Sequence, residues 1–584
     1  MKKTFLSCVA IFLTILPVII ALAWHINNQG WPNDDAANYM VTAYQQYLSF
    51  QEGSLLDGFK ALYQIRGWRP TLFPVLATPF LLLFKGNVLA ATGATLVLCF
   101  LVCQIYIYAI ARRYLDSLRA SLVAVFVGSF PVIARFSTVF FSEIAWLAFF
   151  TGFVFHLLKS ENFRKPLQAT IAGIFLGLAA LIRPAETCAI TILPLTGIIT
   201  IALFKKFFTL NSAVRVIVFV ILSTCLLIVS ALIKQVDYRL VLSIGIIIVL
   251  LQLIIKTNKE QEPGFLGFNF FAVSFVIINL LWWADIMPHL YLWIYNASFG
   301  LLGKITDAPF NLKQIFFIYL FPQATILAAI SLILLWPNTR KESFCEKRLY
   351  VLAMITLGML LPMFFMYAIT GTGDARRIFV GMSFLLMLLA ILSLQDGSIG
   401  RVRDVVLALI VVIQLAGFFY IAKGELPSSG HSLLIRSLAE QMPKRKADKN
   451  ESVILRLLEL GVPRSSAVGV YTIALFQPRD RIYEPSAMQL AALTTGSDIN
   501  IIYYWDICDY YTVIKRLREN RVQFLLIDTY KDPENRSKHQ PSTQFTTALL
   551  EKMESSDADP PGLRRITSFI LDGREHVLFE VKKL

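Results

Sequence analysis

The feature that most constrains this chain is the recurrence of long apolar runs over its first three quarters. Runs of about 17 to 25 apolar residues recur from Thr4 to about residue 421, and we count about thirteen of them. A run of this length forms a helix that crosses the roughly 30 Å hydrocarbon core of a bilayer. Only 16% of the 584 residues are charged, whereas soluble proteins keep about a quarter of their residues charged. The sequence therefore predicts a polytopic α-helical membrane protein.

The net charge of +15 would suggest a nucleic-acid partner in a soluble protein. Here many of the Lys and Arg residues lie in short loops between apolar runs. Such residues set the topology and contact anionic headgroups, so we expect membrane lipids as partners and no nucleic acid. The seven cysteines form no CxxC pair and no disulfide framework.

Lys2 and Lys3 precede the first apolar run, about Thr4 to Trp24, and predict a cytoplasmic N-terminus. The alternative is a signal peptide, because Ala21-Leu22-Ala23 resembles a cleavage site, although the run is longer than a signal core. Further spans are expected to start near Val88, Leu118, Ile144, Leu167, Thr187, Val216, Val241, Gly264, Ile315, Tyr350, Phe379 and Val405.

The apolar run from Thr71 to Phe84 is about fourteen residues long and contains Pro74 and Pro79. We interpret it as an interfacial or re-entrant element, because it is short for a span and proline interrupts helices. With this interpretation the basic loops fall in the cytoplasm, and a short external turn is expected around Arg135 to Glu143.

Thirteen crossings from a cytoplasmic N-terminus place the polar tail outside. We therefore predict a membrane domain over residues 1–423, with interfacial helices in its first external loop (27–85), and an external domain over 424–584. Within the tail, β-rich runs at 467–473, 499–504, 522–527, 566–571 and 576–581 alternate with helical stretches near 485–493, 509–520 and 543–553. This alternation predicts a small α/β domain.

Asp34 and Asp35 form an acidic pair about ten residues after the first span. Two adjacent carboxylates here are either the N-cap of the following helix or catalytic groups. Glu143 lies at the outer end of another span, where a carboxylate is usually functional; the alternative is a helix N-terminal acid that faces water.

Basic residues gather on the same predicted external side, and together they suit a lipid phosphate, although any single arginine could merely extend toward headgroups. They are Arg66, Arg69, Arg135, Arg183, Arg376 and Arg377.

The order of these features resembles the GT-C class of membrane glycosyltransferases, in particular the branch of protein O-mannosyltransferases and aminoarabinose transferases of lipid A. The resemblance covers the whole chain as architecture. Its motifs are Asp34-Asp35 with Tyr39 and Tyr44, Arg69-Pro70-Thr71-Leu72-Phe73-Pro74 through Phe84-Lys85-Gly86, Ser142-Glu143, and Gly177-Leu178-Ala179-Ala180-Leu181-Ile182-Arg183-Pro184. The acidic pair is Asp-Asp where Asp-Glu is commoner, which leaves open which carboxylate is the base.

The resemblance implies about thirteen spans, an external C-terminal domain, and inverting transfer of a sugar from a polyprenyl-phosphate carrier to a lipid, glycan or protein hydroxyl or amine. Asp34 is then the base, with Asp35 and Glu143 as supporting carboxylates that could also hold Mg²⁺ or Mn²⁺. The substrate-binding residues are Arg66, Arg69, Arg135, Arg183, Asp285, His289, Arg376 and Arg377. We expect a bacterial inner membrane, with the tail in the periplasm.

Two alternatives from other classes stay open: a transporter or flippase of a lipid-linked glycan, and a ligase or polymerase of surface polysaccharide. Transporters usually place polar groups near the bilayer midplane, whereas the ionisable groups here lie at one face. Tyr504-Trp505-Asp506 is interpreted as a buried aromatic turn, which disfavours transfer to an asparagine sequon.

Overall fold

The computed structural model divides the chain into two compact units, residues 1–28 with 46–442 and residues 29–45 with 443–584. The structure describes residues 2–27, 35–63, 72–183, 187, 190–191, 266–279, 349–370, 379–394, 400–422, 449–460, 462–463, 467–471, 485–494, 499–503, 515, 517, 521–528, 562–571 and 574–582. The predicted boundary near residue 423 lies outside these residues and stays a prediction.

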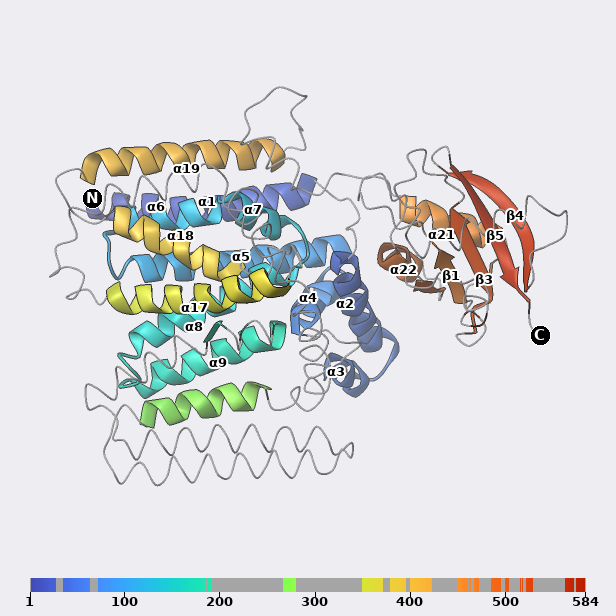
Figure 1. Cartoon of the computed structure of the whole chain (residues 1–584), viewed down its shortest axis with the longest axis horizontal. Helices are drawn as coiled ribbons and strands as arrows, with labels where there is room; N and C mark the ends of the chain where they lie inside the picture. The colour runs from blue at the N-terminus through green and yellow to red at the C-terminus, as the bar shows by residue number, and fades with distance from the viewer. Residues whose placement is uncertain are drawn as a thin grey trace. The chain divides into compact units, whose positions relative to one another are not determined.

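The first unit is a bundle of apolar helices that lie side by side (Figure 1). α8 packs against α9 and α5, and α1 packs against α5, α6 and α19. The helices of the bundle include α1 (Lys2–Asn27), α5 (Val88–Ala111), α6 (Ser117–Gly128), α8 (Ser142–Lys159), α9 (Pro166–Ile182), α17 (Leu349–Thr370), α18 (Phe379–Ser393) and α19 (Gly400–Ala422). A further apolar helix spans Leu266–Asn279.

Two helices within the described residues, Phe5–Asn27 and Val88–Ala111, are long and apolar enough to cross a bilayer. α6 and α7 (Pro131–Thr138) make a third if they are counted as one bent span. The spans expected near Val216, Val241 and Ile315 lie outside the described residues. The number of about thirteen spans therefore stays a prediction.

The external turn expected around Arg135 to Glu143 differs from the structure at Arg135, because the helical segment that begins near Leu118 is bent before it reaches this residue. α6 ends at Gly128, and α7 follows at an angle of 70° to it. Pro131 is the first residue of α7, a position that favours proline because its missing backbone N–H would have no helical partner there. Arg135 therefore lies on a short helix rather than in a turn.

One end of the bundle is marked by contacts between helix ends. The ring Nε2 of His25, near the end of α1, lies 3.0 Å from the carbonyl oxygen of Ser137 in α7. Phe73 of α4 (Leu72–Leu83) stacks on Phe140 with ring centroids 4.3 Å apart. Glu143 follows three residues later, so we call this the Glu143 end.

Contacts of α4 support the prediction that Thr71 to Phe84 does not cross the membrane. α4 has 12 residues and a length of about 18 Å, short of the roughly 30 Å hydrocarbon core. Its first turn contacts Phe140 at the Glu143 end, and its C-terminal end leads at once into α5. Gly93 of α5 lies against His25, so α5 also begins at the Glu143 end.

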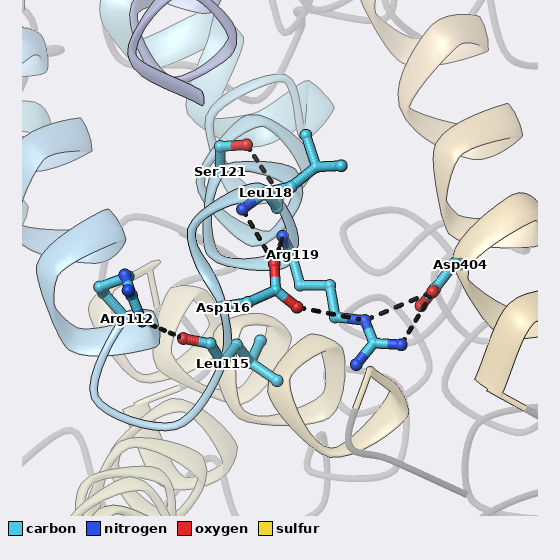
Figure 2. Close-up of polar contacts among 7 residues, drawn as sticks. All are labelled: Arg112, Leu115, Asp116, Leu118, Arg119, Ser121 and Asp404. Atoms are coloured by element: carbon cyan, nitrogen blue, oxygen red, sulfur yellow. Dashed lines mark hydrogen bonds and ion pairs between the residues drawn. The ribbon is translucent and has the colours of Figure 1, made fainter. Parts of the chain in front are cut away.

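The opposite end carries basic residues and is called the Arg119 end (Figure 2). Arg119 near the start of α6 donates to Asp404 near the start of α19, with Nη2 3.1 Å from Oδ2. Farther along the same helices, the Ser129 hydroxyl donates to Gln414 over 2.9 Å. The two contacts show that α6 and α19 run parallel. The paired starts of these helices agree with the grouping of basic loops on one side that the charge pattern predicts.

Small residues let α9 approach the helix Leu266–Asn279 closely. A Cβ on Gly173 would lie 2.1 Å from the Ser274 hydroxyl and 2.2 Å from the Phe271 carbonyl oxygen, and a Cβ on Gly177 would lie 2.9 Å from Ile278. The spacing Gly-x-x-x-Gly is typical of such helix contacts in membranes. Gly177 of the motif that ends at Arg183 thus has a packing role.

Two further helices precede α4: α2 (Asp35–Glu52) and α3 (Leu55–Tyr63). α3 begins with a reciprocal cap, because Ser54 N and Oγ donate to Asp57 Oδ2 while Asp57 N donates to Ser54 Oγ. The hydrogen bonds from Ser54 are the main cause that holds the pKa of Asp57 below its usual value of 3.8. Leu55, Leu56 and Phe59 are exposed, which agrees with the interfacial helices predicted for residues 27–85.

The second unit contains a five-stranded mixed sheet of order β2-β1-β3-β5-β4 (Figure 1). β1, β2 and β3 are parallel, while β4 and β5 form an antiparallel pair beside β3. The elements are α21 (Lys449–Glu459), β1 (Ala467–Tyr471), α22 (Pro485–Thr494), β2 (Asn500–Tyr503), β3 (Phe524–Asp528), β4 (Leu563–Leu571) and β5 (Arg574–Val581). The strands coincide with the five predicted β-runs. The domain of residues 424–584 as a whole stays a prediction.

Candidate functional site

Two of the predicted site residues meet at the Glu143 end. Arg183, directly after α9, forms an ion pair with Glu143 in the first turn of α8. Arg183 Nε also donates to the Ser142 hydroxyl over 3.1 Å. The Glu143 side chain is 0% exposed and that of Arg183 is 14% exposed. Glu143 is therefore not the water-facing helix acid that the sequence left open.

Local structure places both members of the pair. Phe141 has an extended backbone and precedes α8, so Glu143 lies in the first turn, where a carboxylate is favoured by the helix dipole. α9 ends at Ile182, since Arg183 precedes Pro184 in the sequence and a residue before a proline disfavours helical geometry. The packing of α8 on α9 then brings the two side chains together.

An aromatic ring covers the Arg183 guanidinium. The Arg183 Cζ lies 5.6 Å from the ring centroid of Trp146, which is completely buried. The Trp146 indole N–H donates to the Thr187 hydroxyl over 2.8 Å, and Thr187 is buried as well. The cluster of Ser142, Glu143, Trp146, Arg183 and Thr187, called the Arg183 cluster below, fixes the position of a charged group at the Glu143 end of the bundle.

Two further predicted site residues lie on described helices. Arg135 lies in the last turn of α7, half-buried at the Glu143 end. Asp35 is the first residue of α2. The others lie outside the described residues: Asp34, Arg66, Arg69, Asp285, His289, Arg376 and Arg377.

Within the described residues, no group of three or more His, Cys, Asp or Glu side chains is placed to hold a metal ion. One Glu143 oxygen already contacts the cationic Arg183 guanidinium, and a second cation there would be repelled. Glu143 of the predicted Asp35 and Glu143 pair thus fits a metal poorly.

Solved structures of two proteins resemble this chain over most of its length. ArnT from Cupriavidus metallidurans bound to undecaprenyl phosphate matches over 97% of both chains, at 11% identity and a TM-score of 0.50. The oligosaccharyltransferase AglB from Archaeoglobus fulgidus, in complex with an inhibitory peptide and a dolichol-phosphate, matches 89% of this chain and 69% of its own, at 12% identity and a TM-score of 0.47. This chain has a GT-C fold. No protein-family model and no curated protein matches the sequence.

The likeness to ArnT confirms the predicted helical architecture of GT-C type, while the number of spans and the C-terminal α/β domain stay predictions. The sequence motifs did not identify two residues of the Arg183 cluster, namely Trp146 and Thr187. Their signals are positional: Trp146 lies one helical turn after Glu143, and Thr187 lies four residues after Arg183. A tryptophan in an apolar helix is common, so neither spacing alone separates a site residue from a core residue.

Proposed function

We propose that the chain is an inverting glycosyltransferase that moves a sugar from a polyprenyl-phosphate carrier to a hydroxyl or amine of a lipid, glycan or protein. The observation that carries this proposal is the buried Glu143–Arg183 pair at one end of a GT-C fold. Burying two charges costs several kcal/mol per ion before pairing, so such a pair is weak evidence for a stability role and stronger evidence for function.

Arg183 suits the leaving group of this reaction. Guanidinium remains protonated at any physiological pH and binds phosphate through a planar pair of donors. A lipid phosphate needs no acid to leave, but it needs positive charge where its negative charge develops. The ArnT neighbour was solved with undecaprenyl phosphate bound, which supports a carrier of this chemical class for the present chain.

Glu143 is assigned to holding Arg183 rather than to removing the acceptor proton, because one of its oxygens contacts the guanidinium. The base is then Asp34. Asp34 is seven positions after Asn27, the last residue of α1, and a chain of seven such steps extends about 24 Å at most. Asp34 is thus tethered to the end of α1, whose His25 contacts the Glu143 end.

The chemical step follows from these roles. Asp34 accepts the proton of the acceptor O–H or N–H while the acceptor atom attacks the anomeric carbon. The bond between that carbon and the phosphate oxygen breaks on the opposite face, its electrons leave with the polyprenyl phosphate, and the sugar is inverted. Arg183, with Arg66, Arg69, Arg135, Arg376 and Arg377, stabilises the departing phosphate; Asp35, Asp285 and His289 contact the acceptor or the sugar.

The reaction is assigned to the external face of a bacterial inner membrane, with the C-terminal unit in the periplasm. The grouping of basic helix ends at the Arg119 end supports this orientation. The fold comparison favours neither the transporter nor the ligase alternative.

The test is turnover by the purified full chain. Wild type and the Asp34→Asn, Asp35→Asn and Glu143→Gln variants are incubated with a panel of polyprenyl-phosphate sugars and acceptors, and free polyprenyl phosphate is measured. We expect release by wild type and a loss of about 10²-fold or more in Asp34→Asn, in line with loss of a general base. Folded wild type that turns over no donor would overturn the proposal. A full loss in Asp35→Asn alone would move the base to Asp35.

A further inference from the structure

Arg183 follows the end of α9, and its backbone N–H and C=O groups both form hydrogen bonds. Arg183 N donates to the Ala179 carbonyl over 3.0 Å, as the last bond of α9, and Thr187 N donates to the Arg183 carbonyl over 2.9 Å. The Thr187 hydroxyl reaches back across the break and donates to the same Ala179 carbonyl over 3.1 Å. Thr187 therefore restrains the backbone position of Arg183 relative to the end of α9.

The same hydroxyl has a second partner on another helix. It accepts the indole N–H of Trp146 over 2.8 Å. The Thr187 hydroxyl thus donates its proton to Ala179 and accepts a hydrogen bond from Trp146. Through these two bonds Thr187 connects the end of α9 to α8. Both side chains are at most 1% exposed, so neither bond has water as a substitute.

The Trp146 ring also contacts the Arg183 guanidinium. Its ring centroid lies 5.6 Å from Arg183 Cζ, within the range of a cation–π contact. Glu143 and Ser142 contact the guanidinium through its N–H groups. The side-chain contacts from α8 thus restrain both the direction and the plane of the guanidinium.

We propose that Trp146 and Thr187 are positioning residues that hold the Arg183 guanidinium in the plane required to bind the phosphate of a polyprenyl-phosphate donor. This inference rests on the proposed function. Bidentate phosphate binding depends on that plane, and small misplacements of a binding group reduce rates strongly. Neither residue contacts the reacting atoms in this account; both act through Arg183.

The experiment is a double-mutant cycle on donor turnover, with undecaprenyl phosphate affinity as a second readout. Thr187→Val removes the hydroxyl and keeps the shape, and Trp146→Phe keeps a ring face and removes the N–H. Each is expected to lower kcat/KM for the polyprenyl-phosphate sugar about tenfold. The double variant is expected to lower it about tenfold rather than a hundredfold, since both substitutions remove the same hydrogen bond between Trp146 and Thr187. Thr187→Ser is expected to restore activity.

A matched control is Thr356→Val, since Thr356 is also fully buried and its hydroxyl donates to a helix carbonyl, that of Leu352, over 2.9 Å. It is expected to leave kcat/KM unchanged. Variants that lose thermal stability but keep wild-type kcat/KM and affinity would overturn the positioning role and leave the proposed function standing. Wild type that neither turns over donors nor binds undecaprenyl phosphate would overturn both.

Discussion

At the scale of single residues, the Glu143–Arg183 pair couples stability to activity. Removing one partner takes the ion pair away from a charge with little exposure, whereas removing both partners leaves neither charge. Glu143→Gln and Arg183→Gln should each lower the free energy of unfolding by about 1–3 kcal/mol. The double variant should regain part of that loss while turnover stays lost. Thermal unfolding in one detergent checks this, and a double variant less stable than both single variants would contradict it.

Gln104 is a buried polar residue that should lower the free energy of unfolding. It is completely buried in α5, and within the described structure neither its Oε1 nor its Nε2 has a hydrogen-bond partner. Gln104→Leu keeps the volume and removes two unsatisfied atoms, so stability should be equal or higher by about 1–2 kcal/mol.

Gln414→Leu is the matched control for this substitution, because Gln414 accepts a hydrogen bond from Ser129. It should lose stability in the same thermal unfolding measurement. If Gln104→Leu were the more damaging of the two, Gln104 would have a role that its contacts do not reveal.

Residue identity allowed Glu143 and Arg183 to be predicted as candidates, but not as partners. They are forty residues apart, and their meeting depends on how α8 packs on α9. Local signals, such as the helix start before Glu143 and the proline after Arg183, do not encode that packing. The same reason explains why Trp146 and Thr187 could not be distinguished from core residues.

At the scale of elements, polar contacts tie α19 to α6 (Figure 2). Arg119 lies between Asp404, at 3.1 Å, and Asp116, at 3.6 Å, with side chains of Arg119 and Asp404 that are 22% and 29% exposed. A double-mutant cycle of Arg119→Gln and Asp404→Asn should show a coupling of about 1–2 kcal/mol in thermal unfolding. The exposed pair Arg456–Glu459 is the control, with about 0.5 kcal/mol or less. Equal coupling in both pairs would contradict this account.

The start of α3 should respond to pH. Hydrogen bonds from Ser54 favour the ionised Asp57 and hold its pKa below 3.8, so the cap is present above about pH 4 and is lost as the pH falls through the lowered pKa. Hydrogen exchange of the 54–63 peptide in the full chain should therefore accelerate, after correction for intrinsic rates, only at acid pH. Asp57→Asn should abolish that dependence, and an unchanged profile in this variant would contradict the assignment.

Hydropathy predicted the long elements well, because length and composition are enough to define an apolar helix. The run at Val88 to Ala111 coincides with α5. The break at Pro131 was missed, since the apolar run continues through it and hydropathy does not register a bend. The β-runs of the tail were found from alternation and composition, but the order β2-β1-β3-β5-β4 depends on long-range pairing that no local pattern contains.

At the scale of the whole molecule, a helical bundle with a GT-C fold carries a charged cluster at one end. The fold could be predicted because motifs spread over the chain agreed in order with one architecture. The acceptor could not, since no motif of this sequence identifies it.

The most direct test of the central claim is an electron cryo-microscopy structure of the full chain with undecaprenyl phosphate. The account predicts phosphate density at the Glu143 end, within hydrogen-bond distance of the Arg183 guanidinium, with the contact to Glu143 kept. Phosphate bound elsewhere on the saturated protein, with the Arg183 cluster unchanged and distant from it, would contradict the account.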